Sequence, residues 1–201
     1  MIEAIAEYFH TTTAVELIAV ALAIAYLLLA IRASAWCWPL AFASSALYVY
    51  VFAGAHLYMD GGLNLFFAAM AAYGWYQWRH GGPDRGALPI SRAPLRVHGA
   101  ALGVIAVLTL AFGAVLGRYT NQAWPYVDSF IAWASVVTTW LAARKYIENW
   151  TYWIAIDAIA IPVYVNRHLH VTALLFSLYV VLAFVGWFHW QRTSAGERQP
   201  A

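Results

Sequence analysis

Two tryptophans and one carboxylate share a face of an apolar segment in the second half of the chain. Trp150, Trp153 and Asp157 stand at positions i, i+3 and i+7 of the segment 149–166, so a helix brings them to one side. With a rise of 1.5 Å per residue, Asp157 lies about 12 Å along that helix from Asn149. Aromatic faces attract a flat organic cation, and a carboxylate neutralises its charge. The pattern predicts a pocket for a cationic heteroaromatic ligand.

Each of these residues also has a structural interpretation. Trp150 would serve as an aromatic anchor at a membrane surface, Trp153 as core packing, and Asp157 as a hydrogen-bonding residue between helices. An ionisable residue deep in a membrane is costly and by default functional. We therefore predict that all three bind the ligand, with Asn149 beside them.

The segment 62–79 carries a second candidate face. Asn64 is its polar residue, Ala68 and Ala71 leave room beside it, and Trp75 follows on the same side. We expect Asn64 to hydrogen-bond the ligand and Trp75 to line the rim of the pocket. The competing interpretation of Asn64 is a hydrogen bond between helices.

The composition places these segments in lipid. The chain of 201 residues is 64% hydrophobic and 10% charged, whereas soluble domains carry about 25% charged residues. A helix of about 20 apolar residues spans a bilayer. We predict an all-α integral membrane protein with seven transmembrane helices, at 13–31, 36–54, 62–79, 95–117, 124–145, 149–166 and 171–190.

Two groups of three segments match at a fixed offset of 112 residues. Pairs of the same or similar type include Glu16/Asp128, Arg32/Arg144, Trp38/Trp150, Gly74/Gly186, Trp75/Trp187 and Trp78/Trp190. The sequence predicts one membrane domain, residues 1–201, built from two three-helix repeats at 13–80 and 124–192. The helix 95–117 has no counterpart and inverts the chain between them, which gives a 3+1+3 arrangement of parallel repeats like that of the SWEET transporters.

The repeat adds two residues to the candidate pocket. Ser45 is the direct counterpart of Asp157 at the offset of 112, and Tyr48 lies one turn further along the same helix. We expect both to line the pocket. The two copies then differ at the presumed site, as the binding of one asymmetric solute requires.

Basic residues are distributed unevenly between the two sides. Arg118 and Arg167 lie on one side, and the other holds Arg32, Arg79, Arg85, Arg92, Arg96, Arg144, Lys145, Arg192 and Arg198. Because cytoplasmic loops are enriched in Lys and Arg, we expect the N-terminus outside and the C-terminus in the cytoplasm.

Motifs for catalysis and cofactors are absent from the sequence. It contains no HExxH, no CxxC and no P-loop, and its seven histidines fall mostly in loops or at helix ends. The basic residues lie in loops between apolar segments, which is not the pattern of a nucleic-acid-binding protein. We therefore expect no enzymatic activity, no metal, no cofactor and no nucleic-acid partner.

The sequence resembles the Pnu family of vitamin transporters over roughly residues 13–192. The resemblance is most specific in Asp128-Ser129, in the run from Arg144 to Trp150, in the WxxWxxxD pattern that ends at Asp157, and in the run from Tyr73 to Trp78. It implies a seven-helix, SWEET-like homotrimer in the bacterial cytoplasmic (inner) membrane. It also implies facilitated diffusion of a vitamin that a cytoplasmic kinase then traps by phosphorylation.

Nicotinamide riboside is the substrate that we expect, because its cationic ring suits a pocket of Trp and Asp. Thiamine has a cationic ring too, and riboflavin is carried by relatives, so both stay open as substrates of the same fold. Less favoured alternatives are an ion-coupled symporter that uses Asp157 as its proton site and a membrane redox or enzyme subunit.

Overall fold

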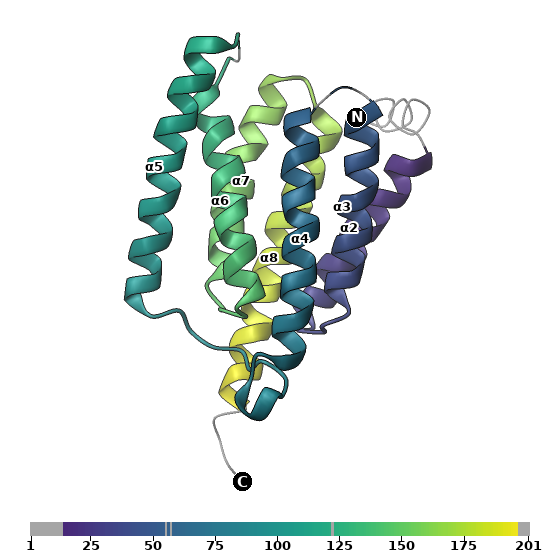
Figure 1. Cartoon of the computed structure of the whole chain (residues 1–201), viewed down its shortest axis with the longest axis vertical. Coiled ribbons are helices and arrows are strands. Elements are labelled where there is room, and N and C mark those ends of the chain that lie inside the picture. The colour runs from purple at the N-terminus through teal and green to yellow at the C-terminus, as the bar shows by residue number, and fades with distance from the viewer. Residues whose placement is uncertain (1–13, 55, 57, 122, 197–201) are drawn as a thin grey trace.

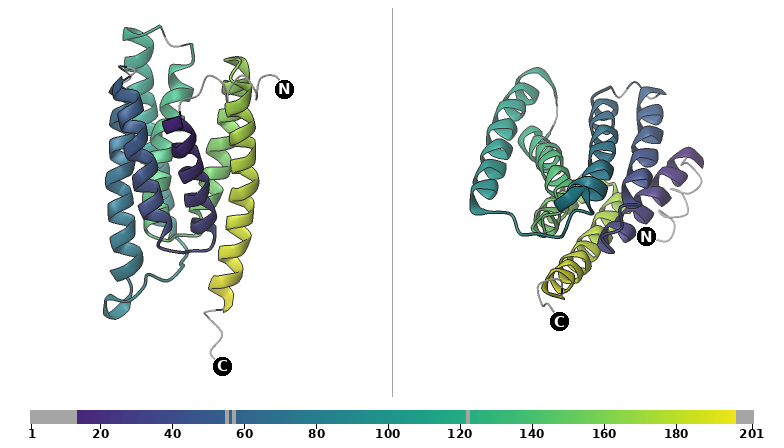
Figure 2. Two further views of the ribbon diagram at one scale, coloured as in Figure 1. Left: turned by 90° about the vertical axis from the view of Figure 1, so that its right-hand side faces the viewer. Right: turned by 60° about the horizontal axis from the view of Figure 1, so that its bottom comes forward.

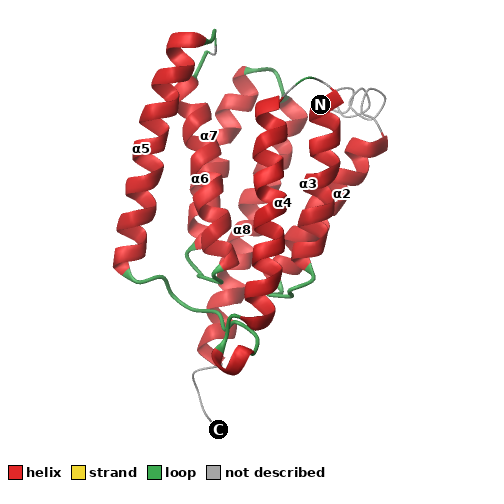
Figure 3. Ribbon diagram, in the orientation of Figure 1, coloured by secondary structure: helices red, strands yellow, loops and turns green. Residues whose placement is uncertain are grey.

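The chain folds into a bundle of helices packed side by side. The computed structural model describes residues 14–54, 56, 58–121 and 123–196, and this part forms seven α-helices and one short 3₁₀ turn (Figure 1). The helices are α2 (Ala14–Ile31), α3 (Cys37–Gly54), α4 (Tyr58–His80), α5 (Leu95–Tyr119), α6 (Pro125–Ala143), α7 (Asn149–Asn166) and α8 (His170–Gly196), and the turn is η1 (Pro83–Arg85). Loops connect them (Figure 3). The prediction of an all-helical chain is confirmed.

Each predicted span corresponds to one helix, with differences at the ends. The span 149–166 coincides with α7, whereas α4 begins at Tyr58 rather than at 62 and α8 continues to Gly196 rather than ending at 190. Gly61 is a weak helix former, but it lies inside α4, where it faces Phe52 of α3. Residue 13, at which the first predicted span begins, and the side chain of Glu16 lie outside the described part.

Length and composition alone identify three of the described helices as able to cross a bilayer. These are α3, α5 and most of α8, while Ile18–Ile31 is an apolar stretch of shorter length. Other helices carry polar side chains such as Ser135, Asn149 and Asp157, and these three line the interior of the bundle. Polar residues that face inward leave the outer surface of a helix apolar.

Two groups of three helices pack around a shared centre. α3 packs against α2 and α4, and α7 packs against α6 and α8. Contacts of α4 with α6 and of α2 with α8 join the two groups. α5 packs against α6 at the edge of the bundle (Figures 1 and 2). The centre therefore belongs to the other six helices.

The backbone recurs at the same offset of 112 residues that the sequence contains. α3 and α7 begin at Cys37 and Asn149 and have the same length of 18 residues. In the turn before α3, Ala33 has a φ of 52°, and in the turn before α7, Lys145 has a φ of 57°. Their N–H groups each donate to the carbonyl three residues earlier, at 2.9 Å. The two turns thus share one geometry.

A tryptophan lies over a glycine in each group of three helices. A Cβ atom on Gly74 would lie 2.4 Å from the ring of Trp38, and one on Gly186 would lie 2.7 Å from the ring of Trp150. Real Cβ contacts of this length do not occur, so both positions require glycine. The two glycines therefore permit the close approach of a tryptophan ring to the neighbouring helix.

Four tryptophans, Trp38, Trp78, Trp150 and Trp190, form what we call the tryptophan cluster. Each is 2% exposed or less. Trp38 packs edge-on against Trp78 with centroids 5.5 Å apart, and Trp150 packs against Trp190 at the same distance. Trp78 and Trp190 meet in the middle at 5.7 Å. The cluster thus joins the two groups of helices through their aromatic rings.

Hydrogen bonds from two indoles cross between the two groups and reinforce this junction. The indole N–H of Trp78 on α4 donates to the carbonyl of Ala142 on α6 at 3.0 Å. The indole N–H of Trp190 on α8 donates to the carbonyls of Ala30 and Ile31 on α2, both at 3.0 Å. Each group therefore donates one indole to the backbone of the other.

The segment 81–94 between α4 and α5 crosses the same end of the bundle. The N–H of Leu88 donates to the carbonyl of Trp78 at 3.1 Å, and the Lys145 ammonium donates to the carbonyl of Leu88 at 2.9 Å. Further hydrogen bonds join Ser91 to Lys145 and Ile147, and Ala93 to the Glu148 carboxylate. The linker is thereby fixed to both groups of helices.

We expect Gly74→Ala to lower the thermal unfolding temperature of the purified protein in detergent. The added methyl group meets the ring of Trp38, and overpacking of this kind costs about 1–3 kcal/mol. Gly103→Ala on α5 is the matched control, because a Cβ there has no neighbour within 4 Å. That change should be neutral or stabilise the helix by up to about 1 kcal/mol. Equal unfolding temperatures for the two variants would contradict the packing argument.

Candidate functional site

A cavity of about 330 Å³ lies between the two groups of helices. Its volume falls in the range of small-molecule sites. Six helices contribute to its walls, and α5 supplies none of the residues that line it: Ala23, Tyr26, Leu27, Ala30, Cys37, Trp38, Ser44, Tyr48, Asn64, Phe67, Trp78, Ile131, Ser135, Ala142, Asn149, Trp150, Trp153, Asp157, Phe176, Tyr179, Ala183 and Trp190.

The tryptophan cluster forms the end of the cavity nearest the linker. Its four members all line the cavity. They stand on α3 and α7 close to the first residue and on α4 and α8 close to the turn where the linker packs. Most of the other lining residues lie further from the linker, whereas Cys37 and Asn149 directly precede Trp38 and Trp150. The cavity therefore has an aromatic floor, and Asn64 and Asp157 are among the polar groups above it.

Six of the eight residues predicted for the site come together in this cavity. They are Tyr48, Asn64, Asn149, Trp150, Trp153 and Asp157. They come from α3, α4 and α7, which the repeat places on both sides of the cavity. Their role in binding stays a prediction, since their position alone does not demonstrate contact with a ligand.

The two tryptophans of the WxxWxxxD pattern have different surroundings. Trp150 is 2% exposed, lies over Gly186 and packs edge-on against Trp190, so most of its surface is used in the core. Trp153 is only partly buried. Of the two rings, Trp153 has more surface left for a ligand.

Asp157 is the one carboxylic acid among the described residues that line the cavity. It is 5% exposed, and the described residues that line the cavity include no Arg, Lys or His. Asn149 lies two turns below it, with its side-chain amide donating to the carbonyl of Tyr146 at 2.6 Å. Among the described lining residues, Asp157 is therefore the one acidic side chain that could pair with a ligand.

Ser45 and Trp75 do not line the cavity. Ser45 is buried, but its neighbour Ser44 lies in the wall instead and donates to the carbonyl of Ala19 at 2.9 Å. Trp75 lies 5.1 Å from Trp36, and the Arg79 guanidinium covers its ring at 4.8 Å. On α4 it is Trp78 that points inward.

Several lining residues were not predicted from the sequence. Tyr26, Trp38, Phe67 and Phe176 come from apolar stretches in which one aromatic residue resembles the next. The repeat could have predicted two of these residues, Trp38 and Phe176. Trp38 is the counterpart of Trp150, and Phe176 is the counterpart of the predicted Asn64 at the offset of 112.

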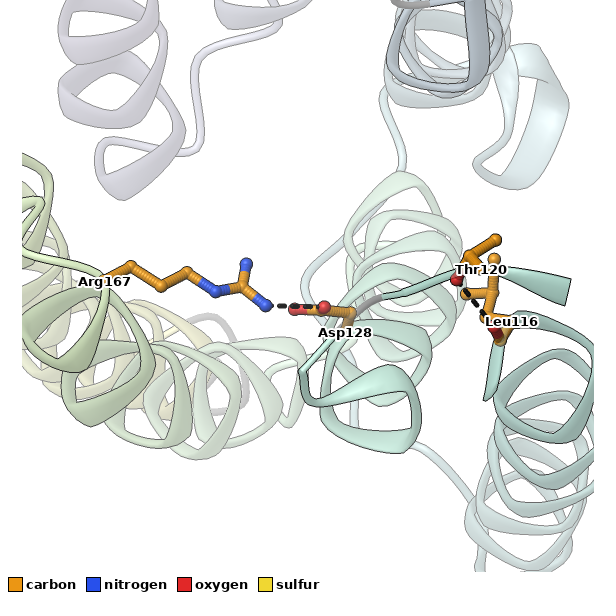
Figure 4. Close-up of polar contacts among 4 residues, drawn as sticks. All are labelled: Leu116, Thr120, Asp128 and Arg167. Carbon is orange, nitrogen blue, oxygen red and sulfur yellow. Dashed lines mark hydrogen bonds and ion pairs between the residues drawn. The ribbon is translucent and has the colours of Figure 1, made fainter. Parts of the chain in front are cut away.

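The opposite end of the bundle carries an ion pair outside the cavity. The guanidinium of Arg167, which follows α7, lies 2.7 Å from the carboxylate of Asp128 in the first turn of α6 (Figure 4). Next to it, Thr120 ends α5 with its N–H and hydroxyl both donating to the carbonyl of Leu116. Asp128 thus ties two helices together, in addition to its favourable place at a helix N-terminus.

The described residues contain no group of three or more His, Cys, Asp or Glu side chains placed to hold a metal ion. The chemistry available in the cavity is that of aromatic faces, amides, hydroxyls and one carboxylate. Such a set can bind and orient a flat polar molecule.

Comparison with known proteins identifies relatives of this chain. Residues 13–192 match the family described as nicotinamide mononucleotide transporter. The riboflavin/roseoflavin transporter RibM of Streptomyces davaonensis is 27% identical over 148 residues, which cover 72% of this chain and 70% of RibM. The nicotinamide riboside transporter PnuC of Escherichia coli is 25% identical over 148 residues, and the match covers 61% of each chain.

The fold has a counterpart among solved structures. The crystal structure of a vitamin B3 transporter PnuC superimposes with a TM-score of 0.73 at 18% sequence identity. The match covers 97% of this chain and 88% of the other. At this level of identity the likeness establishes the fold.

We expect Trp153→Ala to weaken the binding of a vitamin with a cationic ring, nicotinamide riboside or thiamine, by roughly 30-fold, because a desolvated cation–π contact is worth about 2 kcal/mol. Calorimetric titration with nicotinamide riboside, thiamine and riboflavin measures the effect. Trp75→Ala is the matched control, since it removes a tryptophan outside the cavity. An equal loss in both variants would mean that the cavity is not the binding site.

Proposed function

This chain belongs to the nicotinamide mononucleotide transporter family, and on that premise we propose that it carries nicotinamide riboside across a membrane by facilitated diffusion. One observation carries the proposal: a cavity between two groups of helices combines tryptophan rings with a single buried carboxylate, Asp157. A cationic pyridinium ring on a ribose matches aromatic faces, a counter-charge and neutral hydrogen-bonding groups. The relative PnuC carries the name of this substrate.

Riboflavin and thiamine are the alternative substrates for the same cavity. The similarity to RibM, a riboflavin/roseoflavin transporter, favours riboflavin. Riboflavin has no positive charge, however, and would leave the Asp157 carboxylate without an ionic partner. Thiamine has a cationic ring that meets the same requirement. Direct titration with the three vitamins separates these alternatives.

Trapping by a cytoplasmic kinase fits the charge of the cavity. A phosphate group needs cationic or N–H donors, and the described lining residues include no Arg, Lys or His, while Asp157 repels an anion. We therefore infer that the vitamin passes without phosphate and that its phosphorylated form does not return. A kinase then draws uptake forward without any energy input from this chain.

We propose that transport is passive rather than coupled to an ion. Asp157 is the single ionisable carboxylate among the described lining residues, and a second carboxylate or a Lys that would complete a proton relay does not accompany it there. An ion-coupled symporter with Asp157 as the proton site is the alternative. A membrane redox or enzyme subunit is less favoured, since the family consists of transporters.

The proposed architecture is a seven-span, SWEET-like bundle of two parallel repeats, 13–80 and 124–192, with 95–117 as the inverting helix. The recurring turns at Ala33 and Lys145 and the crossed indole hydrogen bonds support it. We further propose the bacterial inner membrane, with the linker and the C-terminus in the cytoplasm. The arginines of the loops at that end support this orientation, and an inactive C-terminal alkaline phosphatase fusion is its test.

A homotrimer is the proposed assembly. The outer surface of α5 exposes large apolar side chains, among them Leu102, Val107, Leu110 and Val115. Such a surface suits lipid as well as a second copy of the chain, so it is compatible with either neighbour. Chemical crosslinking in native membranes should give a band at three times the mass of one chain, and a ladder that stops at one or two chains would contradict a trimer.

Asp157→Asn should weaken the binding of nicotinamide riboside more than that of its reduced, uncharged-ring analogue. The substitution keeps size and polarity but removes the counter-charge, so only the ligand with a positive ring loses an attraction. Parallel titrations of both ligands against wild type and variant measure the difference. If the variant folds normally and binds both ligands as wild type does, Asp157 is a structural residue and the ligand lies nearer Asn64.

In proteoliposomes, labelled nicotinamide riboside should enter until its inner and outer concentrations are equal, and a kinase with ATP enclosed in the vesicles should raise total uptake further. Passive exchange has no means of building a gradient of the unmodified vitamin. Time courses with and without a pH or Na⁺ gradient test this. Accumulation of the unmodified vitamin in response to either gradient would refute facilitated diffusion, and failure of all three vitamins to enter would refute the proposed transport.

A further inference from the structure

The tryptophan cluster separates the cavity from the linker end of the bundle. Trp78 and Trp190 meet in its middle with centroids 5.7 Å apart. Trp38 and Trp150 close it on either side, each in edge-on contact with its neighbour. A solute that moves along the axis between the two groups of helices has to pass through this layer.

The bonds that hold the layer shut all cross between the two groups. Trp78 on α4 donates to Ala142 on α6, and Trp190 on α8 donates to Ala30 and Ile31 on α2. The cluster can open only if α4 moves away from α6, or α8 from α2. Either movement breaks at least one of these indole–carbonyl hydrogen bonds.

The other two indoles of the layer lack the partners that Trp78 and Trp190 have. The indole nitrogens of Trp38 and Trp150 are buried and have no hydrogen-bond acceptor in the described structure. A buried donor without a partner costs free energy. A rearrangement that lets Trp38 and Trp150 donate would offset the loss of the crossed bonds.

We propose that the tryptophan cluster is the gate on the linker side of the transporter, with Trp78 and Trp190 as the residues that hold it closed. Opening releases the carbonyls of Ala142 and Ala30 and separates the two central rings. This inference rests on the proposed function, because a gate has a role only if a solute passes.

The linker braces one of the two gate residues. The Lys145 ammonium lies 4.7 Å from the centre of the Trp78 ring and donates to the carbonyl of Leu88 in the linker. Leu88 in turn donates to the carbonyl of Trp78. Movement of Trp78 therefore requires movement of residues 88 and 145. Trp190 has no such brace among the described contacts, so we expect α8 to move first.

The single cysteine of the chain reports on this gate. Cys37 is fully buried, precedes Trp38 and lines the cavity. Cys37 belongs to the same buried core as the four tryptophans, so in inside-out membrane vesicles a membrane-impermeant maleimide reacts with it only when the packing of that core opens. We expect slow labelling of wild type, and labelling roughly fivefold faster in Trp78→Phe and in Trp190→Phe, because each loses one net hydrogen bond that favours the closed state. Cys37→Ser measures the background.

Two further variants distinguish opening of the gate from a general loosening of the helix bundle. Trp140→Phe is the matched control, since Trp140 is 39% exposed and does not line the cavity. Benzothienylalanine at position 190 replaces the indole N–H by sulfur with little change in shape, so it tests the hydrogen bond even if the phenylalanine variants fold poorly. Faster labelling in this variant, with Trp140→Phe unchanged, supports the gate.

The gate is refuted if the benzothienylalanine protein is labelled at the wild-type rate, or if Trp140→Phe accelerates labelling as much as the cluster variants do. The result is independent of transport, because labelling needs no vitamin. Faster labelling together with no uptake of any tested vitamin would leave the gate standing and refute the proposed function. Normal uptake of a vitamin together with unchanged labelling of Cys37 would support the proposed function and refute the gate.

Discussion

Hydrogen bonds from two indoles determine how the halves of this protein meet. An indole N–H buried among apolar helices has no water to bond, so it must find a carbonyl within the protein. Carbonyls inside a helix accept from the residue four positions later, but those in its last turn lack that intrahelical partner. The carbonyls of Ala30 and Ala142 each accept one turn N–H and keep a second lone pair for an indole. Trp78 and Trp190 reach such carbonyls, at the ends of α6 and α2. The requirement fixes the register of α4 on α6 and of α8 on α2.

This junction also requires small residues beside the tryptophan cluster. For the indoles to reach the backbone, the helices must approach closely, and the positions beside the cluster are Ala30, Ala71, Ala142 and Ala183, each 6% exposed or less. Glycine at 74 and 186 serves the same end, because the rings of Trp38 and Trp150 occupy the space of a side chain. Without a hydrophobic driving force between helices in lipid, such packing and hydrogen bonding provide the association.

The sequence predicted the helices well because apolar length and a repeat are properties of the chain itself. α7 coincides with its predicted span. The meeting of Trp38, Trp78, Trp150 and Trp190 at the centre was not predicted, because the repeat pairs Trp75 with Trp187 in the same way and these two lie outside the cluster. The prediction of cavity-lining residues failed where two similar side chains stand on one helix and only the rotation of that helix about its axis decides which of them faces the cavity. Trp75 and Trp78 are one turn apart and both are tryptophans, so the pattern could not tell that Trp78 faces the core while Trp75 contacts Trp36 and Arg79. Ser44 and Ser45 present the same ambiguity.

Some residues that line the cavity are the same in the two repeats, and others differ between them. Its floor is made of equivalent residues, Trp38 with Trp150 and Trp78 with Trp190, and these positions have to stay alike because both halves use the same junction. Elsewhere in the wall the counterparts differ: Asn64 lines the cavity from one half where Phe176 does so from the other, and Cys37 corresponds to Asn149. If the cavity binds a vitamin as proposed, the residues that break the repeat while lining the cavity are the ones expected to distinguish substrates. Asp157, whose counterpart Ser45 lies outside the wall, departs from the repeat in both side-chain type and position.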